Sequence, residues 1–175
     1  LLRFGYPLGV EGDELVARKG ASVLRRDQLL GSMIWVQGDL LNLPVPLPVT
    51  ISDWEFVPSW ADGQPPIVAY TLTYLDPLQL LTRNVCSGSL LDPLASVATV
   101  LGGERYDPAT KTVVPDARWF TIACAGSAAA KLKLLGYGPQ SSATTVARRQ
   151  ATLKMITADY CGEGVGYTEN GTQVQ

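Results

Sequence analysis

The pattern of hydrophobic residues changes once along the chain, near residue 124, and this change constrains the fold more than any other feature. Before it, short β-prone runs such as Met33–Val36 are separated by turn signals such as Gly-Asp and Lys-Gly. After it, alanine, lysine and leucine dominate, and these residues favour helix. We therefore predict an α+β fold, in which a β-rich N-terminal half (a small antiparallel sheet or sandwich) precedes a helical hairpin.

The chain length of 175 residues predicts a single domain. We expect residues 1–123 to be mainly β, residues 124–161 to form the helical hairpin, and residues 162–175 to form a loop and a terminal β-hairpin. Asn170-Gly171 predicts the turn of that last hairpin, because this dipeptide adopts positive φ easily.

The strongest strand signal is the run 67–74, which is rich in β-branched and aromatic residues. We expect it to pair with residues 51–57 as a long hairpin across the proline-rich link 58–66. Trp60 lies in this link and Trp54 lies nearby. An exposed tryptophan would mark a binding surface, whereas a buried one, the commoner case, would belong to the core.

Three prolines alternate along residues 43–49 and remove three backbone donors, so this segment is not a central strand. It is either an extended edge or a polyproline II segment. The edge interpretation is favoured over a recognition motif for an aromatic groove, because prolines are a common protection of sheet edges.

Helix signals follow further along the chain. A short helix is expected around residues 93–100, ended by Gly102-Gly103. A second is expected over 125–135, with Gly136 as its C′ residue. A third, capped by Ser141 or Ser142, should run to about residue 159. Its packing stripe is expected at positions three and four apart: Ala147, Ala151, Met155 and Ala158.

The surface is expected to carry little charge. Charged residues make up 17% of the chain and the net charge is −2, which argues against a nucleic-acid partner. The pairs Arg25-Arg26 and Arg148-Arg149 are interpreted as solvated. No run approaches the roughly 18 apolar residues of a membrane span. So few charges suggest a surface that is inert, that adheres to other molecules or that a partner partly covers, and the last two are favoured.

Histidine is absent from the chain, which excludes a Ser-His-Asp triad and histidine-based metal sites. The three cysteines, at positions 86, 124 and 161, are one ligand short of a structural zinc site. We therefore predict no metal and no cofactor. Three cysteines in an exported protein would give one disulfide and one remaining thiol, or an intermolecular pair.

Two blocks of residues carry a family resemblance. They are Phe120–Cys124 with Ala128–Lys131 and Gly136-Tyr137, and Gln150-Ala151 with Met155, Ala158–Gly164, Thr168 and Asn170–Thr172. On these residues the segment 118–172 resembles the ADYC-domain family of bacterial proteins, named for the tetrapeptide that stands at 158–161. The resemblance implies an exported domain, often cysteine-rich, and implies no particular activity.

Two departures from the family pattern bear on the disulfide. Where the family has a pair of cysteines, this chain has Leu132 and Thr152. The joint loss implies that these positions face each other across two antiparallel helices. Counting along both helices then implies that Cys124 and Cys161 lie at one level and pair. Cys86 with Cys124 remains the rival pairing.

Several residues have a chemical interpretation beside a structural one. Cys124 lies between a strand and a helix N-terminus, a position that lowers a thiol pKa. It lacks a histidine base, so a structural cysteine is favoured. Asp159 and Glu163 can form a carboxylate pair, but loop hydrogen bonding is favoured. Tyr160 is interpreted as a packed aromatic residue.

The leading functional prediction is a non-enzymatic module, extracellular or in the cell envelope, that binds a protein partner or serves as a subunit of a larger assembly. A signal peptide is expected to have been removed from it. No catalytic residue is assigned, and the speculative binding residues are Trp54, Trp60, Asp159 and Tyr160. One alternative is an enzyme with Cys124 or Cys161 as nucleophile, and another is an intracellular protein with reduced thiols. A small-molecule ligand is left open.

Overall fold

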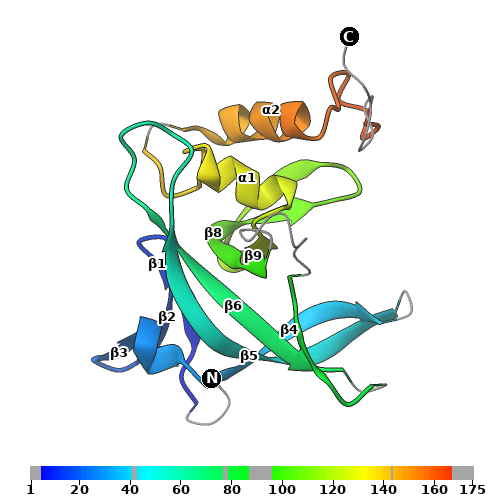
Figure 1. The fold of residues 1–175 in the computed structure, drawn as a ribbon. Coiled ribbons are helices and arrows are strands. Elements are labelled where there is room, and N and C mark those ends of the chain that lie inside the picture. Colours follow the sequence, from blue (N-terminus) through cyan, green and yellow to red (C-terminus); the bar gives the residue numbers. More distant parts are fainter. Residues whose placement is uncertain (1–4, 41–42, 77–78, 87–95, 143, 167–175) are drawn as a thin grey trace.

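A computed structural model describes residues 5–40, 43–76, 79–86, 96–142 and 144–166. It contains two antiparallel sheets, and two α-helices follow the strands in sequence (Figure 1). The predicted α+β class is therefore confirmed. The expected turn at Asn170-Gly171 lies outside the described residues.

The smaller sheet has three consecutive strands: β1 (Leu8–Glu11), β2 (Glu14–Lys19) and β3 (Ser22–Arg25). Short turns join them, because Gly12-Asp13 and Gly20 adopt positive φ. A short 3₁₀ helix, η1 (Arg26–Leu29), leads from this sheet to the larger one.

The larger sheet has the order β4-β5-β6-β8-β9, with β7 also paired to β6. Within it, β5 and β6 form the predicted long hairpin, in which Val57 is paired with Ile67. The strands are β4 (Met33–Leu40), β5 (Leu43–Val57), β6 (Ile67–Leu75), β7 (Thr82–Asn84), β8 (Ala98–Asp107) and β9 (Thr112–Cys124).

The proline-rich segment forms the first half of β5. There β5 pairs with β4 alone, and it reaches β6 only from Thr50 onward. Alternate residues of a strand direct their N–H groups to the same edge, so Pro44, Pro46 and Pro48 remove donors from one edge only. The other edge keeps the donors that pair with β4. The predicted extended edge is confirmed.

The main core lies between the two sheets. It joins Leu15 and Ala17 of β2 to alternate residues of β6, Val68, Tyr70 and Leu72. The Tyr70 ring is fully buried, and its hydroxyl accepts a hydrogen bond of 2.8 Å from the backbone N–H of Leu15. A single side chain therefore packs in the core and ties the two sheets together.

Two helices pack at one end of the larger sheet, where Figure 1 shows α1 (Ala128–Leu134) between the sheet and α2 (Val146–Ile156). The predicted C′ residue Gly136 is confirmed, because it has φ +81° and the next N–H, of Tyr137, bonds to Leu132 O at 2.8 Å. Among the described residues no helix has the length and apolar character needed to cross a membrane.

Helix α2 differs from its prediction in two respects. Its N-cap is Thr145, whose side chain accepts from the N–H of Arg148, and not Ser141 or Ser142. The predicted stripe is wrong, because three of its members, Ala147, Ala151 and Met155, are exposed. The buried face instead carries Arg149 and Leu153, and only the fourth member of the stripe, Ala158, is buried.

The prediction of a short helix around residues 93–100 is wrong for the part of this segment that the structure describes. Residues from Ala98 onward belong to β8 and are completely buried at 98, 100 and 101. Gly102-Gly103 marks an irregularity within β8, not a helix end, and Gly103 has φ +81°. A side chain at 102 would meet Val10 Cβ at 3.0 Å, so glycine allows β1 to approach β8.

Candidate functional site

The disulfide joins Cys86 to Cys124, with a Cα–Cα distance of 5.4 Å. The favoured pairing of Cys124 with Cys161 is therefore wrong, and the rival pairing is the one present. The reason is local structure. Helix α1 begins at Ala128, so Cys124 is the last residue of β9 and the helical counting that placed it beside Cys161 does not apply.

Cys161 is the free cysteine among the described residues, and it is exposed. A bonded sulfur is not a nucleophile, so the alternative enzyme at Cys124 has no thiolate to use. That alternative rests on Cys161 alone.

The tetrapeptide 158–161 ends α2. Ala158 has φ +54°, the left-handed conformation usual for a C′ glycine, and the N–H of Asp159 bonds to Lys154 O at 2.8 Å. The Asp159 side chain is buried and accepts from the Lys154 ammonium and from the N–H of Gly164 at 3.0 Å. The motif thus fixes the loop that follows the helix, as the loop-bonding interpretation predicted.

Electrostatics supports this structural role for Asp159. The hydrogen bond from Lys154 holds the pKa of its carboxyl below the ordinary value, and the Gly164 N–H acts in the same direction. Tyr160 differs from its prediction as a packed residue, because 69% of it is exposed. In the part of the chain that the structure describes, no three metal-ligating side chains gather as a metal site would require.

Trp54 is partly buried at the junction of the two sheets. Its indole N–H donates to Asp27 at 2.7 Å, and the guanidinium of Arg26 lies 5.3 Å from its ring. The same guanidinium lies 5.1 Å from the Phe56 ring, which is edge-on to Trp54. These contacts give Trp54 a packing role.

Trp60 is half-exposed in the loop between β5 and β6. Its backbone N–H bonds to Leu134 O at 2.7 Å, and the Ser59 hydroxyl donates to the same oxygen at 3.1 Å. The loop is thereby attached to the end of α1. Neither Trp60 nor Trp54 lines any of the three hollows described below.

Two other tryptophans line a hollow that we call the aromatic groove. It has a volume of about 400 Å³ and lies between β4 and β9, the two edge strands of the larger sheet. Trp35 is 54% exposed and Trp119 is 43% exposed. The groove is lined by Leu8, Ile34, Trp35, Val36, Tyr106, Arg118, Trp119, Phe120, Thr121 and Ile122.

A second hollow of about 440 Å³ extends the groove toward β1, and the two share Leu8, Arg118, Trp119 and Phe120. Trp119 is held from one side, because the Arg105 guanidinium lies 5.2 Å from its ring and pairs with Asp116 at 3.4 Å. A tryptophan fixed by a cation–π contact presents apolar surface at low entropic cost.

The sequence held only a weak signal for this groove. Trp35 and Trp119 each stand within a β-prone run, where an aromatic residue predicts strand and not exposure. Their exposure depends on the position of β4 and β9 at the two ends of the strand order, which the local sequence does not encode.

A buried ion pair was also missed. Arg149, expected to be solvated, is buried and donates twice to Oε1 of Glu104, which is itself only 2% exposed. The Tyr106 hydroxyl donates to the other oxygen of Glu104 at 2.7 Å, and Thr144 O accepts from Arg149 at 2.9 Å. This network joins α2 to β8.

Comparison with known families adds the decisive observation, because the model of the ADYC domain matches residues 26–175. The chain belongs to the ADYC-domain family. No curated protein matches it, and no solved structure matches it either.

Within this ADYC domain, the match reaches back well beyond the helices to η1. It therefore includes the strands that form the larger sheet and both walls of the aromatic groove. In the naming tetrapeptide, Asp159 is bonded to the loop at the end of α2 and Tyr160 is exposed.

Proposed function

We propose that this chain is a single, non-enzymatic domain of an extracellular or cell-envelope compartment, and that it binds a protein partner in the aromatic groove. The observation that carries the proposal is the pair of half-exposed tryptophans, Trp35 and Trp119, facing one hollow. Tryptophan is the residue most enriched at the energetic centres of protein interfaces.

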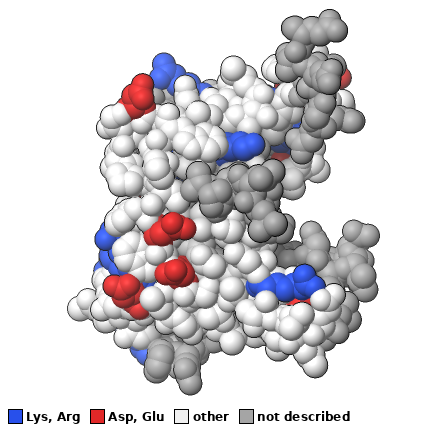
Figure 2. Space-filling view, viewed as in Figure 1, with Lys and Arg blue, Asp and Glu red and all other residues white. Residues whose placement is uncertain are grey.

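The disulfide supports the compartment. The bond between Cys86 and Cys124 is of a kind that persists in oxidising compartments and is rare where thiols are kept reduced. Figure 2 shows a largely uncharged face with acidic and basic side chains in a few separate places. Low charge density of this kind suits a surface that is covered in an assembly.

The position of the groove favours a partner segment in extended conformation. Within the described residues, the outer edges of β4 and β9 are not paired with another strand. An extended segment can add to such an edge through backbone hydrogen bonds while its apolar side chains enter the groove. The partner we propose is therefore an extended segment with alternating apolar residues.

A photo-crosslinking experiment tests this proposal. A benzoylphenylalanine residue replaces Trp35, Trp119 or Trp60 in the protein expressed in its own cells. Positions 35 and 119 should give adducts with the same protein, and position 60, which is 48% exposed outside the groove, should give none. The purified partner should then bind Trp119→Ser at least about tenfold more weakly than the wild type, and bind Trp60→Ser unchanged.

The proposal fails if position 60 crosslinks to the same partner as position 119, or if Trp119→Ser binds it as tightly as the wild type. Rapid labelling of Cys161 by a thiol-reactive probe at neutral pH would support the alternative of an enzyme with a cysteine nucleophile. Intact mass with and without reductant separates the exported protein from the alternative with reduced thiols, because a disulfide accounts for two hydrogens.

A further inference from the structure

A second cavity, separate from the aromatic groove, lies where three loops meet beside α1. Its volume is about 530 Å³, within the range of small-molecule sites. The turn after β1 contributes Gly12–Glu14, the link before β6 contributes Gln64–Pro66, and the segment after α1 contributes residues from Gly136 to Ser142. The lining is divided equally between polar and apolar surface, so it is more polar than that of the groove.

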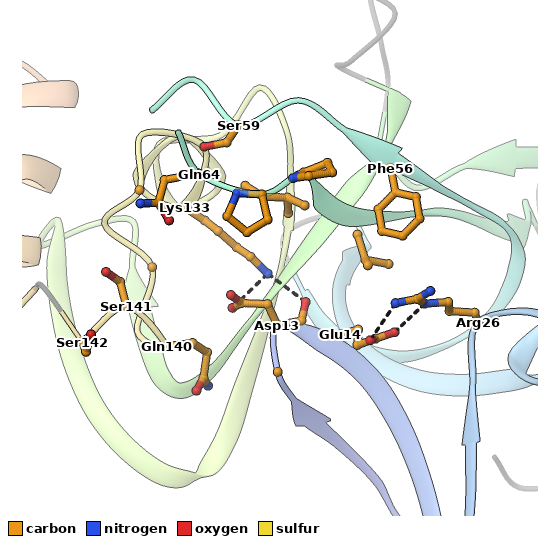
Figure 3. Close-up of a pocket in the computed structure, with 17 residues that line it drawn as sticks. Asp13, Glu14, Arg26, Phe56, Ser59, Gln64, Lys133, Gln140, Ser141 and Ser142 are labelled. Carbon is orange, nitrogen blue, oxygen red and sulfur yellow. Dashed lines mark hydrogen bonds and ion pairs between the residues drawn. The ribbon is translucent and has the colours of Figure 1, made fainter. Parts of the chain in front are cut away.

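Lys133 and Asp13 lie at the centre of this cavity (Figure 3). The Lys133 side chain is 3% exposed, and its ammonium donates to Asp13 O at 2.9 Å and to Val100 O at 2.7 Å. It also lies 3.3 Å from Oδ1 of Asp13. These contacts commit the ammonium to the protein and fix the position of the Asp13 carboxylate.

The other two charges of the lining also cancel. Arg26 donates to both oxygens of Glu14, at 2.9 Å and 3.1 Å, and only 12% of the Glu14 side chain is exposed. Two cations thus face two anions, each in a fixed pair. A charged ligand would find no unpaired counter-charge, so the cavity suits a neutral molecule.

The remaining polar side chains are uncommitted. Gln64, Gln140, Ser141 and Ser142 line the cavity, and within the described residues their side chains form no hydrogen bond to another residue. The Asp13 side chain is 41% exposed, and its Oδ1 faces the Lys133 ammonium. Gln64, Gln140 and Ser142 are exposed, so their side chains bond to solvent and are available to a ligand that enters the cavity.

An apolar wall completes the cavity. Figure 3 shows Gln64, Gln140 and Ser141 on one side of the Lys133–Asp13 pair, and Phe56 and the Glu14–Arg26 pair on the other. Phe56 is 49% exposed, and Pro65 and Pro66 also line the cavity. An aromatic ring and two prolines, in the same cavity as amides and hydroxyls, match a ligand with one apolar face and many hydroxyl groups.

We propose that this cavity binds a neutral sugar of one or two rings. Vicinal hydroxyls of the sugar donate to the Asp13 carboxylate and accept from the Gln64 and Gln140 amides. The C–H face of the ring lies against Phe56. This proposal does not rest on the protein partner, because the cavity and the aromatic groove share no lining residue; the hollow that extends the groove shares Gln140 with the cavity.

The test uses the full chain and a panel of neutral probes: glucose, galactose, mannose, N-acetylglucosamine and their disaccharides. Glucosamine and glucuronic acid serve as charged comparators. Saturation-transfer NMR detects binding and calorimetry measures affinity. At least one neutral probe should bind, and it should bind more tightly than both charged comparators.

Substitutions at exposed positions place the ligand in the cavity without unfolding the protein. Gln64→Ala and Gln140→Ala should each weaken binding by about 5–10-fold, the effect of one lost hydrogen bond. Trp119→Ser is the control and should leave sugar affinity unchanged, because Trp119 lines the aromatic groove and not this cavity. The proposal is overturned if no neutral probe binds, if a charged comparator binds best, or if Trp119→Ser weakens binding as much as Gln140→Ala.

Discussion

The sheets and the helices of this domain are held in place by different interactions. Between the sheets the core is apolar, with Leu15, Ile51, Tyr70 and Val100 fully or almost fully buried, and a disulfide lies at its side. The helices also bury apolar side chains, among them Leu132 and Leu134 of α1 and Leu153 of α2, but they add buried charges that the core between the sheets lacks. The comparison teaches that ionic contacts can add to hydrophobic burial in positioning short helices on a sheet.

Three charged groups illustrate the helical side. Lys133 of α1 donates to backbone oxygens of Asp13 and Val100, and Arg149 of α2 pairs with Glu104. At the end of α2 the Asp159 carboxylate fixes the following loop. Each contact reaches from a helical segment to a strand or a loop, so a change at one of them should loosen the helices before the sheets.

The largest effect is expected from Arg149→Met. It leaves the Glu104 carboxylate buried without its cation, so the free energy of unfolding should fall by about 3–5 kcal/mol in urea titration. Hydrogen exchange should accelerate in α2 more than in β6. Arg148→Met, at the exposed neighbouring position, is the control and should have a smaller effect than Arg149→Met, because it leaves no buried charge behind.

A double variant tests whether Glu104 and Arg149 stabilise the protein as a pair. Glu104→Leu combined with Arg149→Met leaves no buried charge, so the loss should be smaller than the sum of the two single losses. Additive losses would show that the two side chains do not act together, and the ionic attachment of α2 would be rejected.

The next effect concerns the sheet side. Replacing Cys86 and Cys124 by alanine should lower the free energy of unfolding by about 2–4 kcal/mol, because the bond closes a long loop. Cys161→Ala should change it little, since that thiol is exposed and outside the bond. Equal losses from both variants would contradict the pairing. Urea titration with and without reductant checks the same point.

Tyr70→Phe should give a smaller loss of about 1–3 kcal/mol, because it leaves the buried N–H of Leu15 without its acceptor. Tyr74→Phe on the same strand is the control, because its hydroxyl forms no hydrogen bond within the described residues. If the two variants have the same stability, the tie between the sheets is not made by the Tyr70 hydroxyl.

The smallest effect is expected at acidic pH. The folded pKa of Asp159 lies below its unfolded value, so its stabilisation is present above the unfolded pKa and is lost as pH falls through the folded pKa. Unfolding curves of the wild type and Asp159→Asn should therefore differ at pH 7 and converge at low pH. If the two proteins differ in stability by the same amount at pH 7 and at pH 2, the Lys154–Asp159 contact is not the cause of that difference.

Much of the fold could be predicted from local patterns. The hairpin of residues 51–57 with 67–74 follows from alternation and β-branched residues, and the end of α1 follows from Gly136. The proline segment was assigned to an edge because a proline cannot donate to a ladder. The predicted packing stripe of α2 is wrong, because alanines at helical spacing indicate a buried face, whereas the buried face of this helix carries Arg149.

The disulfide shows the limit of the family resemblance. Missing cysteines at 132 and 152 implied facing helices, and a helical count from them led to Cys161. The end of β9 at Cys124 breaks that count, because a strand rises more than twice as far per residue as a helix. A pairing inferred from helical geometry therefore does not extend to a cysteine at the end of a strand.

By itself, the sequence determined the α+β class, the absence of histidine chemistry, the edge role of the prolines and membership of the ADYC-domain family. The tertiary structure alone decided that Cys86 is the partner of Cys124, that Trp35 and Trp119 face one groove, and that Arg149 is buried against Glu104. The physical reason is the distance along the sequence over which each interaction acts. Turns, caps and alternation act over a few residues, whereas these contacts join residues tens of positions apart and exist only once the sheets and helices have packed.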